Sequence, residues 1–304
     1  MGVDLSVEIG GIRMKNPVMV ASGTFGYGPE YAELVDLERL GAIVVKGISP
    51  KPVMGNRPMR TTETVGGLIN AIGLQNPGIE GFLRDYLPFL RRHDVPVIVN
   101  IWGRTVEEYE DVAAGFDGAE GVAGLEVNVS CPNIKEGSCL FGGDPALFRR
   151  VVSAVRAKTR RPLIVKLAPD ISRIALFARA AEECGADAIS LINSIPAMAI
   201  DIETRRPKLG NVTGGLSGPA IKPIALKMVW EAARAVKIPV IGIGGIACAA
   251  DAIEFLLAGA AAIAVGTATF LNPAAAIEIA GGIGDYLARH GLKRVKDLTG
   301  GLRA

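Results

Sequence analysis

Eight short runs of apolar, mostly β-branched residues recur along this chain, and each has a small or polar residue at or next to its end. Continuous apolar character of this kind indicates strands that are covered on both faces. The runs therefore predict a parallel sheet. They are PVMVASG (17–23), AIVVKG (42–47), VPVIVNI (95–101), GLEVNVS (124–130), PLIVKLA (162–168), AISLINS (188–194), IPVIGIGG (238–245) and AIAVGTA (262–268).

Segments with helical periodicity lie between these runs. Thr105 and Glu108 form a capping box ahead of one segment, and Asp144-Pro145 and Asn272-Pro273 precede two others. Asp170 is the predicted cap of a further helix. Strands thus alternate with helices along the chain.

Eight strands that alternate with helices predict an α/β fold, a (β/α)8 TIM barrel. We expect it to form one domain over residues 1–304. The segment VEIGGIRMKN (7–16) precedes the first strand and predicts a short N-terminal β-hairpin at the barrel bottom. A doubly wound open sheet is the alternative, because strand order cannot be read from a sequence.

Composition excludes several classes of function. The net charge is +2 and 5% of residues are aromatic, so we expect no nucleic-acid partner. No apolar stretch reaches the roughly 18 residues of a membrane helix, so we expect no membrane association and a cytoplasmic location. The two histidines and four scattered cysteines predict neither a metal site nor disulfides. Cys184 and Cys248 lie among apolar residues and are expected in the core.

Polar residues gather where the strands end, which is the catalytic rim of a barrel. Lysines close the second and fifth strands, as Lys46 and Lys166. Each buried ammonium needs an anion or a strong acceptor nearby. These lysines belong to a functional site at the rim or, alternatively, to structural ion pairs within the protein. The other rim residues are Asn100, Asn128, Asn193 and Ser194.

Small residues end the last two strands, in GIGGI (242–246) and VGTATF (265–270). Loops after the seventh and eighth strands are the usual phosphate site of a barrel, so these motifs predict a phosphorylated cofactor or substrate. SGPAIKP (217–223) offers a third helix start at this rim.

Two loops carry further candidates. NAIGLQNPG (70–78) presents amide side chains, or is simply a turn. NVSCPN (128–133) places Cys131 directly after a strand, and the glycine-rich segment behind it is a lid or a rigid excursion.

Together these motifs resemble the class 1 dihydroorotate dehydrogenases, flavin enzymes of pyrimidine synthesis, and among them the class 1B catalytic subunit. The resemblance covers nearly the whole chain. NVSCPN and NAIGLQNPG are its most specific motifs, whereas GIGGI and VGTATF fit many flavin- or phosphate-binding barrels. The other matching segments are ASGTFG (21–26), VVKG (44–47), GNRPMR (55–60), IVKL (164–167), LINS (191–194) and GGLSGPAIKP (214–223).

Carried over position by position, the resemblance implies that Cys131 is the general base that takes a proton from C5 of dihydroorotate, while a hydride passes from C6 to N5 of FMN. It places Lys166 at the N1/C2=O edge of the flavin as a second catalytic residue. The implied FMN contacts are Ser22, Lys46, Gly47, Asn100, Asn128, Lys166, Ile192, Gly218, Gly244, Gly245, Gly266 and Thr267. The implied substrate contacts are Lys46, Asn70, Ala71, Ile72, Gly73, Leu74, Asn128, Asn193 and Ser194.

Class 1B also implies a partner. Electrons would reach NAD through a separate subunit that carries FAD and a [2Fe-2S] cluster, in a heterotetramer of two catalytic and two electron-transfer subunits built on a homodimer of this chain. The alternatives are a class 1A enzyme that uses fumarate, another pyrimidine-reducing flavin barrel, and a non-redox aldolase or isomerase with Lys166 as a Schiff base.

Overall fold

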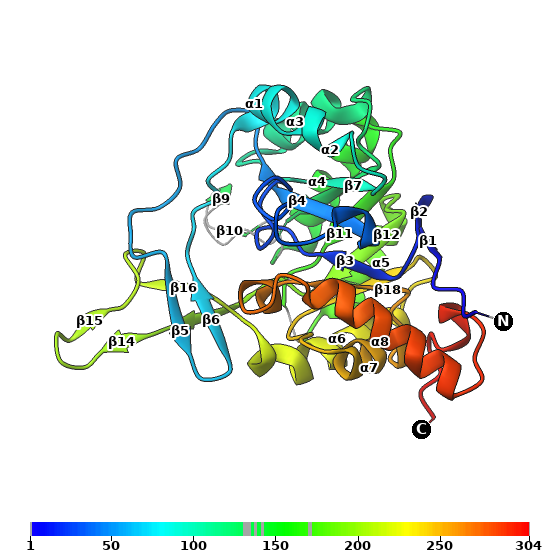
Figure 1. The fold of residues 1–304 in the computed structure, drawn as a ribbon. Helices are drawn as coiled ribbons and strands as arrows, with labels where there is room; N and C mark the ends of the chain where they lie inside the picture. Colours follow the sequence, from blue (N-terminus) through cyan, green and yellow to red (C-terminus); the bar gives the residue numbers. More distant parts are fainter. Residues whose placement is uncertain (1, 130–134, 137–138, 141–142, 170–171, 304) are drawn as a thin grey trace.

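The computed structural model describes residues 2–129, 135–136, 139–140, 143–169 and 172–303 (Figure 1). Within these residues, eight parallel strands close into a barrel, and β18 pairs with β3 to complete it. The predicted (β/α)8 barrel is therefore confirmed, and the open-sheet alternative was wrong. In order around the barrel, the strands are β3 (Val18–Val20), β4 (Ala42–Ile48), β7 (Val97–Ile101), β8 (Gly124–Asn128), β11 (Leu163–Lys166), β12 (Ala188–Leu191), β17 (Val240–Ile243) and β18 (Ala262–Val265).

Strand alternation divides the apolar side chains into two layers. Ile43 and Val99 pack outward against the helices, whereas Met19, Val44 and Ile98 fill the barrel interior. Both faces of each strand are thus buried in apolar surroundings. This explains why the runs show no alternation of apolar and polar residues.

The N-terminal hairpin consists of β1 (Val7–Ile9) and β2 (Ile12–Met14), which pair antiparallel. Ile9, Ile12 and Met14 are buried in the same cluster as the interior side chains of the barrel strands. The predicted hairpin at the barrel bottom is confirmed.

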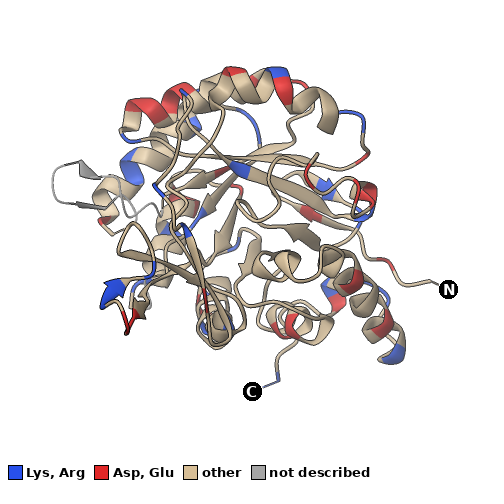
Figure 2. Cartoon of the chain, turned by 60° about the vertical axis from the view of Figure 1, so that its left-hand side comes forward, with Lys and Arg blue, Asp and Glu red and all other residues tan. Residues whose placement is uncertain are grey.

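Helices surround the barrel, and Figure 2 shows that acidic and basic residues are interspersed along them. The predicted N-caps are confirmed at Thr105, which accepts the Glu108 amide, and at Asp144, which accepts two amides of the next helix. The capping box at Thr105 is incomplete, because the Glu108 carboxylate accepts the backbone N–H of Arg104 and not that of Thr105. Asn272 caps the turn before the last long helix, and Asp170 lies outside the described residues. The helices are α1 (Gly78–Asp85), α2 (Leu87–Leu90), α3 (Val106–Asp117), α4 (Pro145–Lys158), α5 (Ile174–Glu183), α6 (Lys222–Ala233), α7 (Ala249–Leu257) and α8 (Ala275–Arg289).

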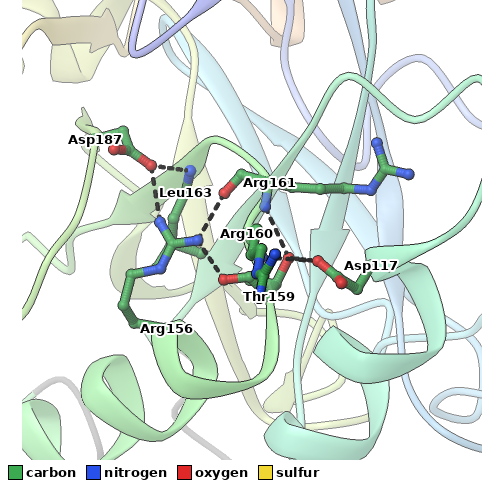
Figure 3. A network of polar contacts seen from close by, with 7 residues as sticks. All are labelled: Asp117, Arg156, Thr159, Arg160, Arg161, Leu163 and Asp187. Carbon is green, nitrogen blue, oxygen red and sulfur yellow. Dashed lines mark hydrogen bonds and ion pairs between the residues drawn. The ribbon is translucent and has the colours of Figure 1, made fainter.

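A polar network ties the amino ends of β11 and β12 to the outer helices (Figure 3). Arg156 pairs with Asp187 at 2.9 Å, and the same carboxylate accepts the backbone N–H of Leu163 at 2.8 Å. Asp117 accepts the Thr159 hydroxyl at 2.8 Å. These contacts lie at the barrel end opposite the strand carboxyl ends, where polar residues serve stability.

A second sheet was not predicted from the sequence. Its order is β13 (Ile195–Met198), β16 (Thr213–Ser217), β6 (Gly67–Asn70) and β5 (Thr61–Thr64), and every pairing in it is antiparallel. A small hairpin of β14 (Ile200–Asp201) and β15 (Arg206–Pro207) projects beyond it, at the left of Figure 1. These strands are short and rich in glycine and polar residues, so they lack the apolar signal of the barrel strands.

The two cysteines expected in the core differ. Cys184 is half-buried against the core, but Cys248 is exposed because it is the N-cap of α7. Of the glycine-rich segment after Cys131, β9 (Lys135–Glu136) and β10 (Cys139–Leu140) pair antiparallel. Its role as a lid stays a prediction. No helix in the described residues is long and apolar enough to cross a membrane.

Candidate active site

A cavity of about 1070 Å³ opens between the carboxyl ends of the barrel strands and the second sheet. Cofactor pockets usually span about 300–1,000 Å³, so this one has room for a cofactor together with a small substrate. Cys131 lies outside the described residues. Every other site residue predicted from the sequence lines the cavity: Ser22, Lys46, Gly47, Asn70, Ala71, Ile72, Gly73, Leu74, Asn100, Asn128, Lys166, Ile192, Asn193, Ser194, Gly218, Gly244, Gly245, Gly266 and Thr267.

Four neighbouring barrel strands bring a polar network together, with two members on the cavity wall and two behind it. Glu126 Oε1 accepts a hydrogen bond from Asn100 Nδ2 at 2.6 Å and lies 3.7 Å from Lys166 Nζ. Glu126 Oε2 accepts a bond from the Ser190 hydroxyl at 2.8 Å. All four side chains are buried. For Lys166 the structure therefore shows the structural ion pair that was the alternative reading, with the Glu126 carboxylate as an anion.

Asn100 has a spare acceptor at the cavity. Its Oδ1 is buried and has no hydrogen-bond partner among the described residues. A Cβ placed on Gly47 would come within 2.8 Å of this oxygen, so glycine keeps the approach to it open. A buried acceptor in this state is suited to a ligand N–H.

Lys46 is half-buried at the rim, and it makes no ion pair within the described part of the chain. Burial and the nearby Arg60 charge lower the pKa of Lys46, while Glu30 partly opposes them. Arg60 is itself held through its Nε, which donates to the carbonyl of Asn56 at 2.7 Å. This pair of cations suits an anionic group of a ligand.

The loop from Asn70 to Leu74 is held in a defined conformation. Its backbone bonds to the preceding loop, from Ala71 N to the Arg60 carbonyl at 2.7 Å and from Asn56 N to the Ile72 carbonyl at 2.9 Å. Gly73 and Leu74 both have positive φ, at 78° and 59°. The Asn70 amide donates to the Gly215 carbonyl at 3.2 Å, which ties the loop to the second sheet.

Asn128 and Asn193 meet across the cavity rim, where Asn193 Nδ2 donates to Asn128 Oδ1 at 3.3 Å. Asn193 Oδ1 accepts the backbone N–H of Ser194 at 2.8 Å. Because each amide is oriented by its neighbour, the two present fixed donors and acceptors to the cavity.

The two small-residue motifs present backbone donors on one side of the cavity. No hydrogen bond within the described residues uses the backbone N–H of Gly244, Gly245, Gly266 or Thr267. Such amides are suited to a phosphate. By contrast, Lys222 of the SGPAIKP motif is engaged elsewhere, in ion pairs with Asp251 at 2.7 Å and Glu254 at 2.8 Å.

Sequence reasoning missed Glu126 and Ser190. A signal for Glu126 was present, since it lies two residues before Asn128 and therefore on the same face of β8. A charged side chain inside an otherwise apolar barrel run needs a partner inside the barrel. Ser190 had no such signal, because a serine is unremarkable in a strand.

The sequence matches the family model described as dihydroorotate dehydrogenase over residues 4–287. The chain belongs to the dihydroorotate dehydrogenase family. It is 57% identical over 300 residues to "Dihydroorotate dehydrogenase B (NAD(+)), catalytic subunit" of Geotalea daltonii, covering 99% of this chain and 98% of that one. It is 58% identical over 299 residues to the protein of the same name from Geotalea uraniireducens, with 98% of each chain covered.

A solved structure agrees in fold with the family assignment. The crystal structure of DHODH in complex with ferulenol from Eimeria tenella superimposes with a TM-score of 0.83 and covers 98% of this chain and 88% of that one. The two sequences are 24% identical, so this likeness concerns the fold.

The residues of the cavity fit a flavin, the cofactor of dihydroorotate dehydrogenases. The spare Asn100 acceptor suits a ring N–H, and the buried Lys166 ammonium, paired with Glu126, supplies a donor on the same wall. The backbone amides of the four residues Gly244, Gly245, Gly266 and Thr267 suit the phosphate of FMN. One set of polar groups in the cavity therefore suits a flavin ring, and a second set suits a phosphate.

Proposed function

We propose that this chain is the catalytic subunit of an NAD-linked dihydroorotate dehydrogenase, which oxidises (S)-dihydroorotate to orotate in the synthesis of UMP. The observation that carries the proposal is 57–58% identity, over 98–99% of the chain, to relatives named as that subunit. The cavity supports it, because amides and lysines suit a ring rich in N–H and C=O groups that also bears a carboxylate.

For FMN and substrate we propose the contacts that the sequence resemblance implies. FMN, when bound, supplies the acceptor for the hydride of substrate C6. Lys166 and Asn100 orient the flavin ring, and the amides around Gly244 and Thr267 bind its phosphate. Lys46 and the loop 70–74 bind the substrate carboxylate and ring, together with Asn193 and Ser194.

The proton of substrate C5 needs a base, and we assign this role to Cys131, which lies outside the described residues. A thiol whose pKa is lowered by a positive neighbourhood is a competent base near neutral pH. The second sheet lies over the cavity and limits the access of water to this proton transfer.

We further propose that residues 1–304 form one FMN-binding domain and that the chain works in a complex. The partner would be an electron-transfer subunit with FAD and [2Fe-2S], in a heterotetramer built on a homodimer of this chain. The words "catalytic subunit" in the names of the relatives support a separate partner. The cytoplasmic location stays a prediction.

The test is anaerobic reduction of the purified chain. It should carry one FMN per chain, and dihydroorotate should bleach the flavin, whereas NAD should be reduced after the electron-transfer subunit is added. Efficient use of fumarate by the chain alone would favour class 1A. Reduction by dihydrouracil in place of dihydroorotate would favour another pyrimidine substrate. A colourless protein that forms a Schiff base at Lys166 would overturn the redox proposal.

A further inference from the structure

Glu126 is a buried carboxylate that the proposed chemistry does not use. Its side chain is 2% exposed, in the middle of β8. Asn128, on the same strand face, lines the cavity, whereas Glu126 lies behind the wall. A charge at this depth is costly unless its oxygens are bonded, so its partners indicate its role.

Two of the three partners of Glu126 are themselves on the cavity wall. Asn100 donates to Oε1 at 2.6 Å, and the Lys166 ammonium lies 3.7 Å from the same oxygen. The third partner, Ser190, binds Oε2 at 2.8 Å and lies behind the wall. Glu126 therefore acts on the cavity through Asn100 and Lys166.

The carboxylate decides which way the Asn100 amide faces. An ionised carboxylate can accept hydrogen bonds and cannot donate them. Asn100 must therefore turn its Nδ2 toward Glu126, which leaves Oδ1 as the buried acceptor without a partner among the described residues. A neutral amide at position 126 could accept or donate, so it would not enforce this orientation.

The carboxylate also offsets the charge of Lys166. The two side chains are 7% and 2% exposed, so little solvent screens them from each other. With Glu126 in place the pair is close to neutral while the ammonium keeps its position. Loss of the carboxylate would remove one negative charge from a position 3.7 Å from this ammonium, and the net charge beside the cavity would become more positive.

We propose that Glu126 is a positioning residue, which holds Asn100 with its acceptor on the cavity wall and both anchors and offsets the Lys166 ammonium. The inference rests on the proposed function, because it takes FMN as the ligand of this wall. It adds a residue that touches neither cofactor nor substrate.

The test compares Glu126→Gln with Ser190→Ala, a matched control that removes one bond to Glu126 and keeps its charge. Two quantities are measured on each protein: the FMN dissociation constant, by fluorescence titration of the apoprotein, and the midpoint reduction potential of the bound flavin. Glu126→Gln should bind FMN about tenfold more weakly, as expected for the loss of a charged hydrogen bond. Its potential should be less negative, because reduced flavin gains negative charge and the variant has lost the buried negative charge behind the cavity wall. Ser190→Ala should stay within about twofold in affinity, with an unchanged potential.

A second comparison separates positioning from mere stability. In a Lys166→Met background, Glu126→Gln should shift the potential less, because the ammonium whose charge the carboxylate offsets is absent. The proposal would be overturned if Glu126→Gln shifted the reduction potential equally with Lys166 and with Met at position 166. It would also be overturned if the potential did not shift with Lys166 in place. If Glu126→Gln does not fold, Glu126→Asp keeps the charge and should weaken FMN binding while it preserves the potential; a shifted potential in this variant contradicts the proposal. If the proposed function is wrong, the result is different, because the protein without substitutions will itself bind no FMN.

Discussion

Single residues at the rim differ in how their charge is balanced. Lys166 is buried next to Glu126, whereas Lys46 is half-buried near Arg60 and has no ion pair within the described residues. A lysine balanced by a buried carboxylate is suited to a fixed position. A lysine near another cation is suited to binding an anion that comes and goes.

Lys46 should make substrate binding sensitive to alkaline pH. Burial and the Arg60 charge hold its pKa below the ordinary 10.5. We therefore expect the KM for dihydroorotate to rise as the pH increases through this lowered pKa, where the ammonium is lost. Lys46→Arg stays charged and should show a flat KM. If the KM of the protein without substitutions stays constant up to the pH at which an ordinary lysine loses its proton, this assignment is contradicted.

The free energy of unfolding should increase over the same pH range in which substrate binding weakens. The unfolded chain holds the Lys46 proton up to the ordinary pKa of 10.5, so it binds more protons than the folded chain between the two pKa values. The contribution of Lys46 to the free energy of unfolding therefore rises with pH in that window. Below the lowered pKa, the cost of the half-buried charge is present in full. Thermal unfolding at the same pH values separates weaker substrate binding from loss of structure.

Cys131→Ala should retain FMN and lose most of the reductive reaction. Removal of a general base typically costs about 10²–10⁴-fold in rate. Stopped-flow reduction of the bound flavin by dihydroorotate measures this rate directly. Cys248→Ala is the matched control, because this thiol is exposed at the start of α7 and should leave the rate unchanged. Near-normal reduction of Cys131→Ala would remove the thiol from the role of base.

At the scale of elements, the barrel strands bear the polar rim and the second sheet covers it. The contact between the two is close at Gly215 in β16, where a Cβ would lie 2.0 Å from the Ser194 hydroxyl. Asn70 of β6 also binds the Gly215 carbonyl. Asn70, where the loop 70–74 begins, and Ser194, after the sixth barrel strand, thus meet at one glycine.

Gly215→Ala should therefore weaken substrate binding more than FMN binding. The added methyl group must displace Ser194 or shift β16 against β6, and both changes disturb residues proposed to bind orotate. We expect at least a tenfold rise in KM, from about 1.4 kcal/mol of lost binding. Gly281→Ala is the control, because a Cβ there meets nothing within 4 Å. Equal KM values for the two variants would contradict the close contact at Gly215.

At the scale of the whole molecule, the cavity draws on strands from both ends of the sequence. Its lining runs from Ala21, after the first barrel strand, to Ala275, at the start of α8. A ligand that contacts so many segments binds the folded barrel and has no site on the unfolded chain.

FMN should consequently stabilise the entire barrel. At a free FMN concentration 100-fold above its dissociation constant, the free energy of unfolding should increase by about 2.7 kcal/mol. Denaturant unfolding of the apoprotein with and without FMN measures the increase, and riboflavin, which lacks the phosphate, is the comparison ligand. An unfolding midpoint that FMN does not move would contradict a specific site.

From the sequence alone, the eight barrel strands, the hairpin and the polar residues at the strand ends that line the cavity could be predicted, because apolar runs and their polar ends are local features. The chemical roles came from a family resemblance. Tertiary structure was needed for barrel closure, for the second sheet and for the Glu126 network. Each depends on pairing between distant segments, such as Asn70 with Gly215 and Glu126 with Ser190. Local periodicity carries no record of such pairing, because any strand edge can in principle bond to any other.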